Sequence, residues 1–132
     1  MAVRAATTIS VLISLAFAQG PKTGTGPPRT LVGEISYFGL SALPSNSTVH
    51  VYFSDITSHP PRIVAEKRFL IGDEQIPIKF SLTNLSVETG HEYSVCGDIT
   101  ILRRRAFDCD KPVPIHLERW PQLIKLVLRR AP

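Results

Sequence analysis

The chain has 132 residues, of which 43% are hydrophobic and 20% are charged. This size fits a single domain, and the apolar fraction is large enough to build a core, which excludes a chain that is disordered throughout. The net charge of +4 is uneven, because residues 99–132 hold eight Lys or Arg against three acids, whereas residues 31–98 hold four against eight. A basic C-terminal third of this kind favours an acidic protein segment or an anionic lipid surface as partner.

The first 20 residues have the three parts of a secretory leader. Arg4 gives a basic start, residues 9–17 are mostly apolar, and Ala16-Phe17-Ala18 provides a small-residue cleavage site. The apolar stretch is short for a transmembrane helix. We therefore expect residues 1–18 to be a cleavable signal peptide and the Gly/Pro/Thr-rich residues 19–29 to be a flexible linker. Export also argues against a nucleic-acid partner.

From Thr30 onward, short segments with alternating apolar and polar residues are separated by Gly, Pro, Asn and Asp. Period-two alternation is typical of β-strands that bury one face. Residues 72–74 predict a hairpin turn, and the last segment could instead be a short helix, since Leu123, Ile124 and Val127 also fit a helical spacing. The predicted strands cover residues 30–38, 48–56, 63–71, 76–82, 91–102, 106–110 and 122–130.

About seven short strands favour an all-β fold over residues 30–132, an immunoglobulin-like or prealbumin-like β-sandwich of antiparallel strands. The segment around Gly90 and Tyr93 looks like a tyrosine corner, in which the hydroxyl bonds to backbone upstream. Alternation assigns one face of each strand to the core. The residues predicted to point inward include Val49, Val51, Phe53, Ile76, Ile78, Phe80, Leu82, Ile124, Leu126 and Leu128.

Cys96 and Cys109 are the only cysteines, and they flank Arg103-Arg104-Arg105 almost symmetrically. A hairpin whose exposed tip is the arginine run brings the two cysteines within disulfide reach, and the leader implies an oxidising compartment. We predict a disulfide that pins this hairpin. The alternative is a pair of free or redox-active thiols, although C-x-x-C spacing is absent.

The sequence offers no catalytic motif. No G-x-S-x-G, no phosphate-binding glycine loop and no Cys/His nucleophile context is present, and no two histidines share a metal-ligand spacing. We therefore expect a binding or assembly protein, with no cofactor, metal or small-molecule substrate.

Two basic segments are the candidates for partner binding. The arginine run could recognise carboxylates or lipid head groups, or could simply be a solvated turn. The C-terminal strand mixes large apolar residues with cations and could present an edge or face to a partner segment. The partner-binding candidates are Arg103, Arg104, Arg105, Leu123, Leu126 and Arg129.

Several ordered segments resemble the YbaY/YscW-type envelope proteins. They are Gly33–Tyr37, Ala42–Pro44, Val49–Ile56, Ile63–Lys67, Gln75–Phe80 and His91–Val95, and together they cover most of residues 31–110. The two cysteines, the arginine run and the basic C-terminus make the chain look most like the type III secretion pilotin branch (the YscW/ExsB kind).

The resemblance implies a small β-sandwich protein of the Gram-negative envelope without catalytic activity. A pilotin binds the C-terminal segment of a secretin subunit, brings it to the outer membrane and assists its oligomerisation. The expected location is thus the periplasm, in association with the inner leaflet of the outer membrane. The alternative is a YbaY-type periplasmic binding module with no secretion role. One feature departs from the lipoprotein pattern, because no cysteine available for acylation precedes Cys96.

Overall fold

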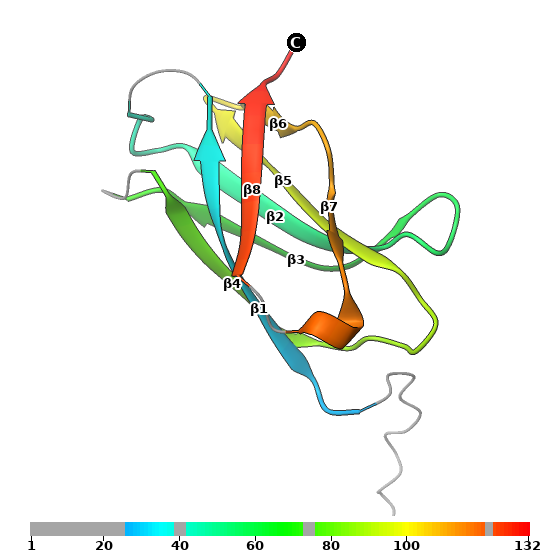
Figure 1. Ribbon diagram of the computed structural model, residues 1–132. Helices are drawn as coiled ribbons and strands as arrows, with labels where there is room; N and C mark the ends of the chain where they lie inside the picture. Colours follow the sequence, from blue (N-terminus) through cyan, green and yellow to red (C-terminus); the bar gives the residue numbers. More distant parts are fainter. Residues whose placement is uncertain (1–25, 39–41, 73–75, 121–122) are drawn as a thin grey trace, which may run out of the picture.

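The structure is a computed structural model that describes residues 26–38, 42–72, 76–120 and 123–132. The predicted leader, most of the linker and part of the turn at residues 72–74 lie outside the described residues. Within them, eight strands and one short 3-10 helix alternate with turns (Figure 1). The elements are β1 (Arg29–Tyr37), β2 (Thr48–Asp55), β3 (Arg62–Leu70), β4 (Ile78–Leu85), β5 (Tyr93–Ile101), β6 (Arg104–Cys109), β7 (Val113–Ile115), the 3-10 helix η2 (Leu117–Arg119) and β8 (Leu123–Arg130).

The all-β prediction is confirmed, but the strands form one curled sheet instead of the two sheets of a sandwich. The strand order is β3-β2-β5-β6-β8-β1-β4, and β7 pairs with β5 beside β6. The ends of this path, β3 and β4, approach each other, since Lys67 on β3 donates a hydrogen bond from Nζ to the Ser81 carbonyl on β4 at 3.4 Å. The sheet is therefore nearly closed and barrel-like.

The strand β8 explains why two separate sheets do not form. It pairs antiparallel with β6 and parallel with β1, so it joins the two halves that a sandwich would keep apart. The parallel pair also corrects the prediction that every strand is antiparallel. Of the two alternatives for residues 122–130, the strand is observed, because burial alternates strictly along β8.

The core fills the inside of the curled sheet, as the alternation predicts. Val49, Val51 and Phe53 on β2 are fully buried, and Ile124, Leu126 and Leu128 on β8 are at most 7% exposed. At the tyrosine corner, the Glu88 N–H donates a hydrogen bond to the Tyr93 hydroxyl at 2.9 Å, which fixes the entry to β5.

The region between β3 and β4 differs from the prediction in two ways. These strands lie at opposite ends of the strand order and are not neighbours in the ladder, so they do not form the predicted hairpin. Ile76, predicted to be in the core, is 46% exposed and precedes β4. The physical reason is Pro77, which has no N–H to donate, so the strand begins after it.

None of the helical segments in the described part of the chain is long and apolar enough to cross a membrane.

Gly33 marks the tightest point of the sheet. It lies on β1 between Phe80 of β4 and Ile124 of β8, and a Cβ atom at this position would lie 2.5 Å from the Ile124 carbonyl oxygen and 2.5 Å from the Phe80 ring. Backbone cannot move aside as a flexible side chain can, so only glycine fits without a shift of the strands.

We predict that Gly33→Ala lowers the free energy of unfolding by about 1–3 kcal/mol, because β1 must move away from β4 or β8 to make room. The measurement is urea denaturation. Gly72→Ala is the matched control, since a Cβ atom there meets nothing within 4 Å, and its effect should stay within about 0.5 kcal/mol. Equal effects of the two substitutions would contradict this account of β1.

Candidate partner-binding site

The turn between β5 and β6 is two residues long. Leu102 and Arg103 both have positive φ values, 51° and 67°, and Ile101 pairs with Arg104 across the turn. Such turns match the right-handed twist of the strands that they join. The predicted tip is thus shifted by one residue: Leu102 and Arg103 form the turn, and Arg104 and Arg105 are the first residues of β6.

A hollow of about 460 Å³ lies beside this turn. Its lining comes from the loop before β2, the end of β5, the start of β6 and the end of β8. The end of β8 reaches the hollow because β8 runs antiparallel to β6, with Arg130 opposite Phe107. The apolar lining residues are Ala42, Leu43, Pro44, Ile101, Ala106, Phe107 and Ala131. The polar ones are all arginines, namely Arg104, Arg105 and Arg130. We call this feature the arginine-rimmed hollow.

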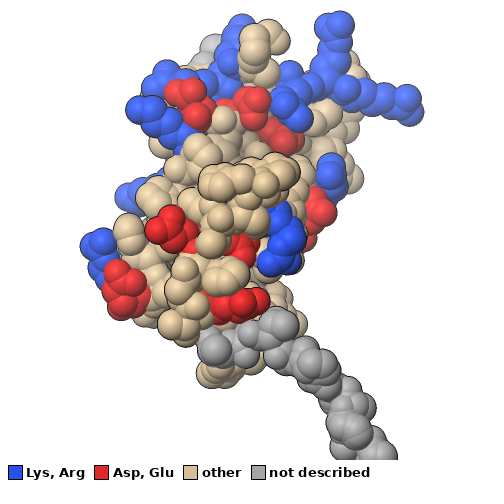
Figure 2. All heavy atoms as spheres, turned by 90° about the vertical axis from the view of Figure 1, so that its right-hand side faces the viewer, with Lys and Arg blue, Asp and Glu red and all other residues tan. Residues whose placement is uncertain are grey.

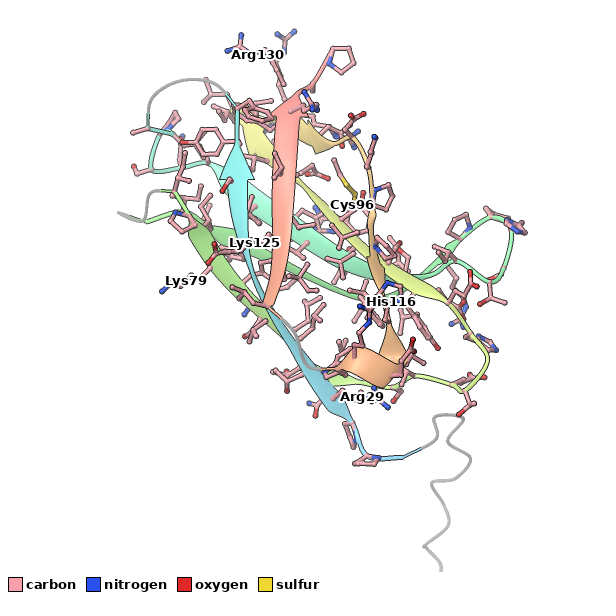
Figure 3. All side chains as sticks on the ribbon, in the orientation of Figure 1. Arg29, Lys79, Cys96, His116, Lys125 and Arg130 are labelled. Carbon is pink, nitrogen blue, oxygen red and sulfur yellow. A yellow bond between two sulfur atoms is a disulfide. The ribbon has the colours of Figure 1, made fainter. Side chains whose placement is uncertain are left out.

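The charge at the rim is only partly neutralised. Arg105 Nη1 lies 3.5 Å from the Asp108 carboxylate, but within the described part of the chain neither Arg104 nor Arg130 has an ion pair. Figure 2 shows long basic side chains projecting from this end of the molecule, and Figure 3 places Arg130 there, far from Lys79 and Lys125. Unpaired guanidinium groups beside an apolar surface can bind carboxylates or phosphates.

The other predicted site residues lie elsewhere on β8. Leu123 is 54% exposed on the outer face of the sheet, opposite Val32. Arg129 lies on the same outer face, where it pairs with Asp110 at 3.3 Å and stacks over Phe38 at 5.2 Å. Leu126, in contrast, is 1% exposed and belongs to the core, so it is not on a surface that a partner could reach.

Sequence reasoning missed Arg130 and the apolar lining of the hollow. The arginine was part of the basic C-terminal strand, but only the register between β6 and β8 reveals that it lines the same hollow as Arg104 and Arg105. Local alternation predicts which residues share a face of one strand and says nothing of which strands are neighbours.

The predicted disulfide between Cys96 and Cys109 is present in the structure, with a Cα–Cα distance of 5.7 Å. It joins the middle of β5 to the end of β6. At this point the partner of β5 changes from β6 to β7, which pairs with residues 93–95. The bridge therefore holds β6, and with it the lining of the hollow, against β5.

A polar cluster occupies the outer face of β2, β3 and β5, next to Arg103 and Arg105. His50 Nε2 lies 2.7 Å from Glu66, and its Nδ1 lies 3.4 Å from Asp98. The carboxylates therefore already have a cationic or hydrogen-bonding neighbour. Across residues 26–38, 42–72, 76–120 and 123–132, no three His, Cys, Asp or Glu side chains are grouped so that they could hold a metal ion.

A second polar cluster surrounds Asp55, which is only 1% exposed. Its Oδ1 accepts a hydrogen bond from the Thr57 N–H at 2.9 Å, and its Oδ2 lies 2.7 Å from His91 Nδ1. Burial acts to raise the pKa of Asp55, but these hydrogen bonds outweigh it, and the pKa is lowered. The same hydrogen bond raises the pKa of His91. This pair ties the end of β2 to the start of β5 and is structural.

The chain is similar to known proteins both in sequence and in structure. The sequence profile of the type III secretion system lipoprotein chaperone family (YscW) matches residues 27–126. Among solved structures, an alternative pilotin from the type II secretion system of Vibrio cholerae superposes with a TM-score of 0.72 and 24% identity, covering 79% of this chain and 97% of the other. At that identity the likeness shows a shared fold. A comparison with curated proteins found no match.

The Asp55–His91 pair predicts a dependence of stability on pH. The raised pKa of His91 contributes stability that is present below its unfolded value of about 6.5 and is lost as the pH rises through the folded value. The lowered pKa of Asp55 contributes stability above its own unfolded value, which is lost only in acid. The free energy of unfolding should therefore fall as the pH rises above about 6.5 and through the raised pKa of folded His91, and His91→Asn should remove most of this slope. An unchanged slope in the variant would contradict the assignment.

The disulfide predicts a second stability effect. Replacing both cysteines by serine should lower the free energy of unfolding by roughly 3 kcal/mol at most, because the bridge closes a short loop in the unfolded chain. Denaturation with and without reductant measures the effect, and reductant should not change the serine variant. Two alkylatable thiols in freshly exported protein would contradict the bridge.

Proposed function

Since the chain belongs to the family of type III secretion system lipoprotein chaperones (YscW), we propose that it acts as a pilotin, a protein that binds a secretin subunit and assists its outer-membrane localisation and oligomerisation. The observation that carries this proposal is the extent of the family match. Residues 27–126 run from just before β1 into β8 and so include β1 to β7 and the first half of β8. The shared fold with a type II secretion pilotin supports the same role.

We also propose a location and a mode of action. The leader-like residues 1–18 would direct the chain to the periplasm. There it would accompany the secretin subunit to the inner leaflet of the outer membrane. Arg129 on the outer face of β8 is a cation that suits an anionic lipid surface.

The partner segment in this proposal is the C-terminal part of the secretin subunit. It would bind at the end of the molecule where the β5–β6 turn and the end of β8 meet. Arg103, Arg104 and Arg105 are proposed to contribute there by charge. Leu123 and Arg129 offer a second contact on the outer face, while Leu126 would support β8 from within the core.

The proposal predicts a defect in secretin assembly. Deleting the gene should reduce secretin multimers in the outer membrane several-fold and lower effector secretion, and the wild-type gene should restore both. Multimers are measured in membrane fractions by non-denaturing separation and immunodetection.

A gene that lacks the codons for residues 1–18 is the control for export, and it should fail to restore multimers. Unchanged multimers together with unchanged effector secretion in the deletion strain would contradict the pilotin role. That outcome would favour a periplasmic binding module with no part in secretion.

A further inference from the structure

We infer that the arginine-rimmed hollow binds a short amphipathic segment of a partner protein, in which an apolar side chain fills the hollow and flanking carboxylates pair with Arg104 and Arg130. The inference rests on the proposed function only for the source of the segment, the secretin subunit. The chemistry of the hollow is independent of that source.

The first support is the distribution of ion pairs. Arg62, Arg68, Arg105 and Arg129 each lie within 3.3–3.7 Å of a carboxylate of the same chain. Arg104 and Arg130 lie at the hollow, and no ion pair is found for either of them among the described residues. Arg29, Arg103 and Arg119 also lack an ion pair there, but they do not line the hollow. A carboxylate from another molecule would supply the missing partner, and it would do so with the bidentate geometry that arginine favours.

The second support is the apolar floor between these arginines. Phe107 and Ile101 belong to the core or pack against it, and Leu43 and Ala106 are partly buried next to them. The volume of about 460 Å³ lies in the range of binding pockets, which are mostly apolar with a few placed polar groups. Burying an apolar side chain here would remove it from water and would also strengthen the ion pairs at the rim.

The third support is the spacing of the two arginines. Arg130 is opposite Phe107 in the β6–β8 pairing. Because Arg104 pairs with Ile101 and Phe107 pairs with Ile99, the two arginines lie two residues of β5, or about 7 Å, apart along the sheet. Two arginines at different positions along the sheet can pair with two carboxylates of one peptide. A peptide segment also supplies the apolar side chain that the hollow would bury, and this favours a protein segment as the occupant.

The test uses fluorescence anisotropy with a labelled peptide that has leucines flanked by glutamates, and with the same peptide carrying glutamine in place of glutamate. The mature protein should bind the glutamate peptide and bind the glutamine peptide at least about tenfold more weakly, since a charge-assisted hydrogen bond contributes about 1.5–3 kcal/mol. Affinity for the glutamate peptide should fall as the salt concentration rises.

The variants distinguish binding at the hollow from attraction by the general positive charge of the protein. Arg104→Gln combined with Arg130→Gln should weaken binding at least about tenfold. Lys79→Gln combined with Lys125→Gln removes the same charge from the outer face, away from Arg130 (Figure 3), and should leave affinity within about twofold. Ala131→Trp should block the hollow from beyond the end of β8, without altering a strand residue. Thermal unfolding shows whether each variant is folded.

The outcomes decide between occupants. Equal weakening by both double variants, or unchanged binding by Ala131→Trp, would overturn the inference. The inference would also be overturned if the protein bound anionic vesicles but not the glutamate peptide. It would likewise be overturned if the peptide did not bind and the protein instead self-associated in a way that the arginine variant abolished.

Capture of the secretin subunit from envelope extract separates this inference from the proposed function. Equal capture by the wild type and by the arginine variant would overturn the inference and leave the pilotin role intact. Peptide binding with no capture of the secretin by the wild type would overturn the pilotin role and leave the chemistry of the hollow intact.

Discussion

The insertion of β8 between β1 and β6 is the interaction on which the rest of the structure depends. Among the described strands, β1 and β4 join the backbone ladder of the other strands only through β8. The C-terminal residues therefore complete a sheet whose first strand begins at Arg29, and a large share of the contacts in this fold join residues far apart in the sequence. Such non-local pairing costs loop-closure entropy before it gains any contact, so β8 becomes ordered only together with the core beneath it.

The parallel pairing of β8 with β1 also sets strict steric limits. Because Gly33 is pressed between Ile124 and Phe80, β1 lies close to both neighbours, and Leu126 and Ile35, which are opposite each other, pack with at most 1% exposure. Close packing of this kind fixes the register, since a slip of one residue would turn the core face of β8 to solvent. The fixed register is what brings Arg130 opposite Phe107.

The electrostatic consequence appears at one end of the molecule. On the outer face of the sheet, His50 lies 2.7 Å from Glu66 and 3.4 Å from Asp98, and at the other end Asp55 is held by His91 and Thr57. The end formed by the β5–β6 turn and β8 has more cations than acids, and its cations border an apolar hollow. This contrast is the basis on which we propose this end of the molecule as the partner-binding surface.

Much of the fold could be predicted from the sequence, because strand alternation and turn chemistry are local. The buried residues of β2 and β8, the tyrosine corner and the disulfide all follow from spacing within one or two adjacent segments. The family resemblance in ordered segments was likewise a property of the sequence, and the match over residues 27–126 agrees with it.

Strand order could not be predicted in the same way, since alternation is satisfied equally by two stacked sheets and by one curled sheet. The hairpin expected between β3 and β4 was wrong because these strands are not neighbours in the ladder, which local patterning does not reveal. The inward position expected for Ile76 was wrong because β4 begins only after Pro77.

The sequence by itself determined that the chain is an all-β protein with a basic C-terminal third and a pinned β5–β6 hairpin. Only the tertiary structure decided that Arg104 and Arg130 meet at one apolar hollow while Leu126 is withdrawn into the core. The physical reason is that a binding surface on a β-sheet depends on which strands are neighbours and in which register, and these are fixed by core packing across the whole chain.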